Sequence, residues 1–167
     1  VYGHLLGEDP RANGIARRID RHPPSVAGFV ILLAVRGTTP GIEHHNVWFP
    51  PAYDEEFDAI FGPEPRPVDD PTIYACVPKD PSMRPDADHE SWFILVNAPR
   101  QGVQERGAVD WTAPGVADAY ADTILRRLAE RGVDIRERVL WRELRTPVDY
   151  ARDARAPHGV IYGASSN

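Results

Sequence analysis

Residues 25–35 read Ser-Val-Ala-Gly-Phe-Val-Ile-Leu-Leu-Ala-Val and lie between the Pro23-Pro24 pair and Gly37. The run has no charged side chain and contains several β-branched residues, which favour strands. An apolar run of this length between turn-forming residues is typical of a strand that is buried on both faces. It is about half of the roughly 20 residues that a membrane-spanning helix needs. We therefore expect this strand at the centre of a sheet in a globular domain.

The hydrophobic pattern around this run predicts further strands and helices. Strands are expected at residues 45–49, 72–77, 91–97 and 138–144, with a return to extended structure at 159–163. Amphipathic helices are expected at about 53–61 and 113–131. A short helix should begin where Thr146 caps and Pro147 takes the first helical position. We predict one α/β (α+β) domain over residues 1–167, with a mixed, partly antiparallel sheet and helices packed against it.

The composition narrows the classes of binding partner and the cellular location that fit this sequence. The 167 residues carry 19 basic and 25 acidic side chains, which gives a formal net charge of −6 at pH 7. This negative balance argues against a nucleic-acid partner, which needs a clustered basic surface. Cys76 is the single cysteine, so the sequence excludes an internal disulfide and a zinc site built from cysteines. We expect a cytoplasmic location.

The adjacent histidines His44 and His45 are the first candidates for chemistry, because imidazole binds metals and moves protons near neutral pH. Neighbouring side chains in an extended segment point to opposite faces, so we expect the two rings to diverge rather than meet at one ion. Glu43 beside them has the same geometric problem as a third ligand, and we therefore predict no metal site. One ring should pack or hydrogen-bond in the sheet, while the other meets solvent or a ligand cavity.

Other catalytic motifs are missing from the sequence. Cys76 lies inside a strand pattern, where a small buried side chain is its common role, and no serine occupies a Gly-x-Ser-x-Gly turn. Neither a Gly-x-Gly-x-x-Gly motif nor a Walker loop is present, so the sequence shows no recognisable cradle for a dinucleotide. These absences argue against a hydrolase and against a nucleotide site within these residues.

Aromatic residues are the remaining candidates for a binding site. They occur at helical spacing and on the expected strands, at Tyr53, Phe57, Phe61, Trp48, Phe49, Trp92 and Phe93. The same spacing suits either the wall of a large apolar cavity or the hydrophobic core. Core packing is the commoner role of such residues, and we favour it on spacing alone.

Six segments occur in a characteristic order: His44–Pro50, Tyr53–Phe61, Asp70–Tyr74, Glu90–Val96, Leu140–Asp149 and Ala156–Gly163. Taken together they resemble the central part of the phytoene desaturase family, which are carotenoid-modifying flavoenzymes of the flavin amine oxidase superfamily. The resemblance extends from about residue 25 to residue 167. The glycine-rich segments that bind FAD in that family are absent here. The resemblance therefore implies the substrate-binding domain of a longer flavoenzyme.

For that longer protein, the resemblance implies an FAD-dependent desaturation or related oxidation of a long, apolar isoprenoid, with a hydride passing from carbon to the flavin. It also implies that the flavin-binding domain is a partner and that the lipid-soluble substrate brings peripheral membrane contact. The isolated residues are then expected to be inactive, to bind no cofactor and to self-associate, for example as a homodimer, through surfaces that the flavin domain would cover.

The site residues are also implied by the resemblance. It places His44, His45 and Asn46 on a strand that faces the substrate cavity, with Trp48 and the other aromatic residues named above in the cavity wall rather than in the core alone. Tyr162 and Gly163 fall in the return toward the flavin-binding region, where Gly163 is the cofactor-binding candidate. No acid or base is assigned, and desaturation, isomerisation and ketolation all stay open. The main alternative is a self-contained module that binds an apolar ligand or a protein without chemistry. A third, weaker hypothesis is a metal enzyme that depends on His44 and His45.

Overall fold

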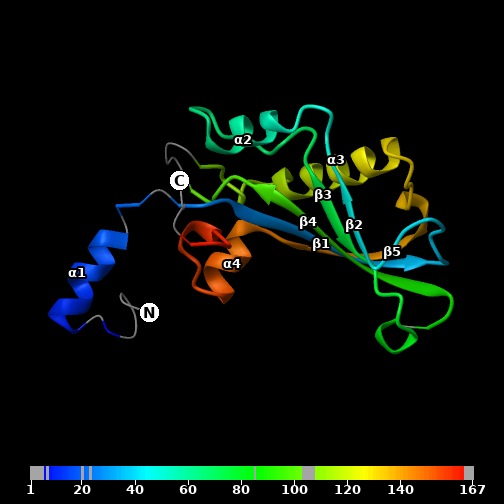
Figure 1. Cartoon of the computed structure of the whole chain (residues 1–167), viewed down its shortest axis with the longest axis horizontal. Coiled ribbons are helices and arrows are strands. Elements are labelled where there is room, and N and C mark those ends of the chain that lie inside the picture. Colours follow the sequence, from blue (N-terminus) through cyan, green and yellow to red (C-terminus); the bar gives the residue numbers. More distant parts are fainter. Residues whose placement is uncertain are drawn as a thin grey trace.

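The computed structural model describes residues 6, 8–19, 21–22, 24–84, 86–102 and 108–163, and Figure 1 traces the chain. The strands are β1 (Ala27–Arg36), β2 (His45–Trp48), β3 (Ile73–Cys76), β4 (His89–Ala98) and β5 (Val139–Arg145). The helices are α1 (Pro10–Ile19), α2 (Asp54–Phe61), α3 (Val116–Glu130) and α4 (Pro147–Asp153). Short 3-10 turns occupy Pro81–Met83, Arg136–Arg138 and Pro157–Gly159. The predicted class, helices packed on a sheet, is confirmed.

Within the described residues, five strands form one sheet in the order β2-β3-β4-β1-β5, and each pairing between these strands is antiparallel. The sheet is thus antiparallel throughout rather than mixed, because even β2 and β3, which α2 connects, run in opposite directions. The predicted antiparallel neighbours at 72–77 and 91–97 are β3 and β4. β1 is an interior strand, as its apolar run predicts, but β4 takes the central place. The first five residues of β1 are buried whichever face they point to, and burial alternates from there on.

The helix α3 packs on one face of the sheet and creates the main core. Alternate side chains of β1 and β4 point to this face, including Phe29, Ile31, Trp92 and Ile94, which are 0–2% exposed. On α3 the buried residues are Tyr120, Ala121, Ile124, Leu125 and Leu128. The ring of Phe29 lies 5.0 Å from the ring of Tyr120 in an edge-to-face contact. The apolar stripe predicted for this helix therefore forms the core.

The helix α2 is held against the sheet by a buried carboxylate. Glu56 is 1% exposed, and its Oε2 accepts a hydrogen bond of 2.7 Å from the backbone N–H of Thr72. Its Oε1 accepts a second hydrogen bond of 2.8 Å from the side-chain amide of Asn97. One side chain thus joins α2 to the residue before β3 and to the end of β4.

A second buried carboxylate ties the loop after β1 to β4. Glu90 is 2% exposed and accepts hydrogen bonds from the backbone N–H of Thr39 at 3.0 Å, the Thr39 hydroxyl at 2.7 Å and the Trp92 indole at 3.0 Å. Burial raises the pKa of Glu90, but these hydrogen bonds outweigh it and hold the pKa below its ordinary value. Arg138, in the 3-10 turn just before β5, donates a further hydrogen bond of 2.7 Å to the Thr39 hydroxyl, which adds this turn to the same network.

The C-terminal segment begins as predicted and then departs from the prediction. The N–H and the hydroxyl of Thr146 both donate to the Asp149 carboxylate, at 2.7 and 2.9 Å, and open α4. The extended return expected at 159–163 is present only as a bridge between Val160 and Ala27. The reason is that the preceding residues turn tightly: Gly159 has φ of +74°, and a Cβ there would collide with the carbonyl of Pro147.

The helix α1 was not expected and lies away from the sheet in Figure 1. The sequence signal for it is the helical spacing of Ala12, Ile15, Ala16 and Ile19. None of the helices in the described residues combines the length and the apolar character that crossing a membrane requires.

The role of Glu56 can be tested by removing its side chain. We expect Glu56→Ala to lower the free energy of unfolding by about 1–3 kcal/mol, because the amides of Thr72 and Asn97 lose their acceptor. Urea unfolding measures the change. The matched control is Glu55→Ala, which removes the neighbouring exposed carboxylate. Equal effects of the two substitutions would contradict a specific role for Glu56.

The contribution of Glu90 to stability should depend on pH. Because its pKa in the folded protein is below the ordinary 4.5, the contribution is complete above pH 4.5 and is lost as the pH falls through the folded-state pKa. We expect Glu90→Gln to reduce stability at pH 7 and to make the loss of stability below pH 4.5 shallower, measured by thermal unfolding across a pH series. Glu137→Gln changes an exposed carboxyl and serves as control. A Glu90→Gln curve parallel to that of the wild type would rule out this contribution.

Candidate functional site

The sheet face opposite α3 is largely apolar, and strand register determines its side chains. Leu32 pairs with Phe93 across β1 and β4, and Ala34 pairs with Trp141 across β1 and β5. We call this surface the open face; its apolar and thiol members are Leu32, Ala34, Val47, Tyr74, Cys76, Phe93, Leu95 and Trp141. Trp141 is 52% exposed and Phe93 is 37% exposed. Soluble proteins rarely leave a large apolar surface exposed, and such a surface is typical of a binding site.

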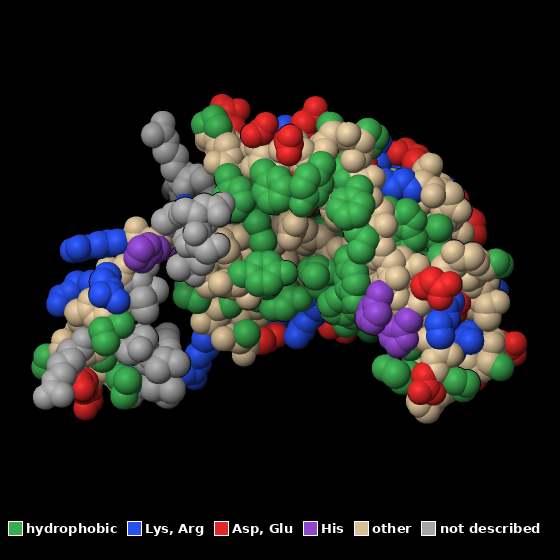
Figure 2. Space-filling model, viewed as in Figure 1, with side chains coloured by type: hydrophobic (Ala, Val, Ile, Leu, Met, Phe, Trp, Pro, Cys, Tyr) green, Lys and Arg blue, Asp and Glu red, His purple; other side chains and the backbone are tan. Residues whose placement is uncertain are grey.

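A groove of about 260 Å³ lies on the open face, and its walls include Leu32, Ala34, Cys76, Phe93 and Trp141. Figure 2 shows hydrophobic side chains gathered over the sheet on this side of the molecule and continuing toward α2. The groove draws on β1, β3, β4 and β5, so that separate parts of the sequence contribute to it. Apolar walls of this kind suit a ligand that offers hydrocarbon rather than charge.

Aromatic side chains of α2 and of the loop before it also remain exposed. Phe49, Tyr53 and Phe57 form successive edge-to-face contacts, with ring centroids 5.9 and 5.3 Å apart. Phe49 is 65% exposed and Phe61 is 54% exposed. The prediction of core packing is wrong for these residues, because α2 packs on the domain through Glu56, Ala59 and Ile60 instead. It is also wrong for Phe93, because strand register directs this side chain to the open face. The prediction is confirmed for Trp92, which is buried, and Trp48 packs at the edge of the core.

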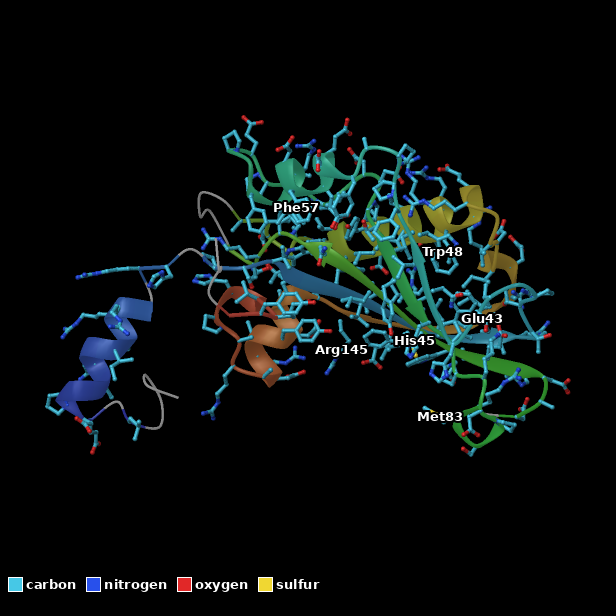
Figure 3. The ribbon with its side chains drawn as sticks, viewed as in Figure 1. Glu43, His45, Trp48, Phe57, Met83 and Arg145 are labelled. Atoms are coloured by element: carbon cyan, nitrogen blue, oxygen red, sulfur yellow. The ribbon has the colours of Figure 1, made fainter. Side chains whose placement is uncertain are left out.

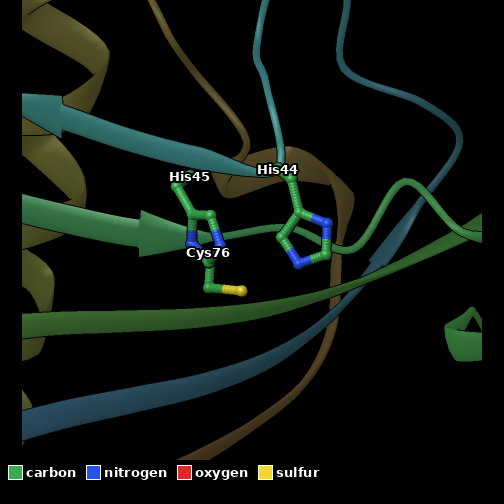
Figure 4. Close-up of side chains that lie close together, drawn as sticks. All are labelled: His44, His45 and Cys76. Atoms are coloured by element: carbon green, nitrogen blue, oxygen red, sulfur yellow. The ribbon is translucent and has the colours of Figure 1, made fainter.

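The two adjacent histidines meet a cysteine at one border of the open face. His45 pairs with Cys76 across β2 and β3, and the rings of His44 and His45 lie with centroids 4.5 Å apart. Figure 4 shows the three side chains directed toward one another. The prediction that the two rings diverge is wrong, because β2 begins at His45 and His44 precedes the regular alternation of the strand. We call these three residues the His–Cys cluster.

A tyrosine orients this cluster. Nδ1 of His45 is 2.8 Å from the hydroxyl of Tyr74, which lies two residues before Cys76 on the same strand and face. Burial raises the pKa of the Tyr74 hydroxyl, and the neighbouring Cys76 thiol raises it further. The hydroxyl therefore keeps its proton and stays available as a hydrogen-bonding group beside the His45 imidazole and the Cys76 thiol.

The other sequence-predicted site residues do not join His44 and His45. Asn46 points to the opposite face, where its amide bonds to the backbone of Glu43, accepting from the N–H at 2.8 Å and donating to the carbonyl at 2.7 Å. Trp48 pairs with the buried Ile73 on the helix-covered face. Tyr162 is 71% exposed at the far end of the chain. Their proposed roles in binding stay predictions.

Gly163, the cofactor-binding candidate, is the last residue that the structure describes. Its carbonyl accepts a hydrogen bond of 2.9 Å from the N–H of Ser25 just before β1. It has φ of +76°, and a Cβ at this position would meet nothing within 4 Å. Its contacts are thus those of a turn next to β1, and its role toward a cofactor also stays a prediction.

A charged pair lies at the β5 border of the open face. Arg145 contacts Asp153 of α4 at 3.1 Å and Glu143 at 3.6 Å. Figure 3 shows Arg145, His45 and Phe57 around the open face of the sheet, whereas Met83 lies in the loop before β4.

Sequence reasoning missed Cys76 and Trp141 as site residues. The signal that identifies them is strand alternation, once the covered face is known.

Comparison with known proteins gives this surface a context. The chain is 30% identical over 164 residues to phytoene desaturase (lycopene-forming) of Paracoccus sp., and the match covers 96% of this chain and 31% of that protein. It is 31% identical to carotenoid 3,4-desaturase of Haloarcula japonica, over 82% of this chain and 26% of that protein. It is 32% identical to 4,4'-diapolycopene oxygenase of Methylomonas sp., over 88% of this chain and 29% of that protein.

No family model matches the chain. The chain spans about three tenths of the length of these curated relatives. The match nevertheless covers most of the chain, 82–96% of it in these three comparisons. The resemblance inferred from the sequence is thus confirmed, and the chain is a relative of the phytoene and carotenoid desaturases and of the carotenoid oxygenases.

Proposed function

We propose that this chain is the substrate-binding region of an oxidoreductase that desaturates or otherwise oxidises a long, apolar isoprenoid, and that the open face holds the hydrocarbon. The observation that carries the proposal is the uncovered apolar sheet face in a chain related to carotenoid desaturases. A sheet face offers a gently twisted surface on which side chains repeat about every 6.6 Å along a strand, every second residue, and about every 4.8 Å between strands. Such a surface suits an extended chain without polar groups.

The distribution of polar groups supports the same role. The groove is walled by apolar side chains and the Cys76 thiol, together with Ser91, and none of its residues is charged. The charged side chains of this face, Glu143 and Arg145, lie on the edge strand β5. A hydrocarbon gains free energy by leaving water, at about 25 cal/mol for each Å² that it buries. A charge inside the groove would have to be desolvated without compensation. The surface therefore favours an apolar ligand over a charged one.

The resemblance implies FAD as the cofactor, and a bound flavin accepts a hydride equivalent from carbon. The described residues do not fit a dinucleotide, however, because every pairing between their named strands is antiparallel. A dinucleotide pyrophosphate is usually held at a helix N-terminus inside a parallel strand–helix–strand unit. We assign FAD to other parts of a longer protein and expect the 167 residues alone to be inactive.

In that longer protein the flavin-binding region would cover the open face and enclose the groove. The chain by itself leaves Phe49, Phe61 and Trp141 more than half exposed, and such apolar surface favours association with a second copy. The proposal also includes a cytoplasmic location with peripheral membrane contact, since the substrate dissolves in lipid.

Binding of a hydrocarbon to the open face can be measured directly on the 167-residue chain. An achiral, acyclic carotenoid in detergent micelles should acquire circular dichroism in its visible absorption band when it binds. We expect Trp141→Asp to weaken binding at least about tenfold, because contact with about 100 Å² of indole surface is worth about 2.5 kcal/mol. The matched control is Met83→Asp, which changes a side chain of similar exposure away from the open face. Equal affinities of the two variants would contradict the assignment of the site.

The oxidoreductase part of the proposal needs the protein encoded by the full reading frame. We expect it to purify with bound FAD and to oxidise an acyclic carotenoid precursor. Trp141→Asp should lower kcat/KM at least about tenfold while the FAD content, read from the flavin absorbance, stays unchanged. A full-length protein that binds the carotenoid but holds no flavin would instead favour the non-catalytic binding module.

A further inference from the structure

The His–Cys cluster brings together three side chains that are common metal ligands in proteins. The ligand atoms of His44, His45 and Cys76 all lie within 4.8 Å of one another. His45 is exposed, and His44 and Cys76 are half-buried, so an ion can reach them from solvent. Two imidazoles and one thiolate form a donor set that suits a borderline-soft ion.

The observed spacing is close to what one ion requires. Zinc binds imidazole nitrogen at about 2.0–2.1 Å and thiolate sulfur at about 2.3 Å, in tetrahedral geometry. Those values place two nitrogens about 3.4 Å apart and a nitrogen and a sulfur about 3.6 Å apart. The separations in the cluster, all within 4.8 Å, exceed these distances by little more than 1 Å, a gap of the size that side-chain rotation can close.

The backbone and one neighbour hold the ligands in place. The carbonyl of His44 accepts a hydrogen bond of 2.8 Å from the N–H of Val77, which extends the β2–β3 pairing to the cluster. The contact of 2.8 Å between Nδ1 of His45 and the Tyr74 hydroxyl occupies that nitrogen and leaves Nε2 to bind a metal. A metal-bound histidine usually has such a partner on its other nitrogen, which fixes the tautomer and the ring orientation.

We propose that His44, His45 and Cys76 bind one zinc ion, with the fourth coordination position open to water or to a ligand in the groove. Cys76 belongs both to the cluster and to the groove wall, so the ion would lie at the border of the open face. Tyr74 is a positioning residue that acts through His45. The site goes beyond the proposed function, because neither hydrocarbon binding nor flavin chemistry requires a metal.

The test is a titration of the 167-residue chain, without a histidine tag, with cobalt(II) as a spectroscopic substitute for zinc(II). We expect one cobalt ion per chain, tetrahedral d–d bands in the visible and a sulfur-to-cobalt charge-transfer band in the near-ultraviolet. Cys76 is the single cysteine, so that band reports this residue alone. Added zinc should displace cobalt and abolish both sets of bands.

Variants identify the ligands. Cys76→Ala should abolish the charge-transfer band, and His44→Ala and His45→Ala should each weaken zinc binding at least about hundredfold, since loss of a second-shell partner alone costs about 10–100-fold. Tyr74→Phe should weaken binding about tenfold and keep the charge-transfer band. The matched control is His22→Ala, which removes an exposed histidine outside the cluster and should change nothing.

Several results would overturn the proposal: a wild-type chain that binds cobalt without a charge-transfer band, binding that survives alkylation of Cys76, or equal losses from His44→Ala and His22→Ala. Far-ultraviolet circular dichroism of each variant separates loss of a ligand from loss of the fold. Metal binding is read from the cobalt bands and hydrocarbon binding from the circular dichroism of the carotenoid, so each site has its own readout. Failure of the metal site and failure of the hydrocarbon site can therefore be told apart.

Discussion

The antiparallel pairing of β1 with β4 is the interaction on which the rest of the structure depends. It runs without a break from Ala27 opposite Ala98 to Arg36 opposite His89. Because side chains alternate along a strand, this register sends Phe29 and Ile31 to the core and Leu32 to the open face. β3 and β5 then extend the same alternation on either side. A slip of one residue would exchange the core with the groove, so the buried face fixes the binding surface as well.

Covering only one face of the sheet has an energetic consequence. The core under α3 is close to fully buried, whereas Phe93 and Trp141 on the other face keep 37% and 52% of their surface in water. Each such side chain forgoes part of the free energy that burial would provide. The buried carboxylates Glu56 and Glu90 hold α2 and the loop after β1 against the sheet, and neither segment contributes a residue to the groove. The fold thus maintains an apolar surface that a partner or a ligand can cover.

The elements that local sequence signals specify were predicted, and the surface that depends on distant contacts was not. The apolar run of β1, the stripe of α3 and the Thr146 cap follow from neighbouring residues. Tyr53 and Phe57 have helical spacing whether α2 turns them inward or outward, and only the packing of Glu56, Ala59 and Ile60 decides the direction. The prediction that the rings of His44 and His45 diverge was wrong for a related reason. Strand alternation applies inside β2, and a boundary shifted by one residue changes which way His44 points.

The groove and the His–Cys cluster are physically coupled through Cys76. As a neutral thiol, this side chain is a small apolar part of the groove wall. As a metal ligand it would be a thiolate, and its charge would be balanced by the ion beside His44 and His45. The polarity at this end of the groove therefore depends on whether an ion is bound. A hydrocarbon chain would extend over a neutral Cys76, whereas an ion with its water would end the apolar surface there and so set how far a chain enters.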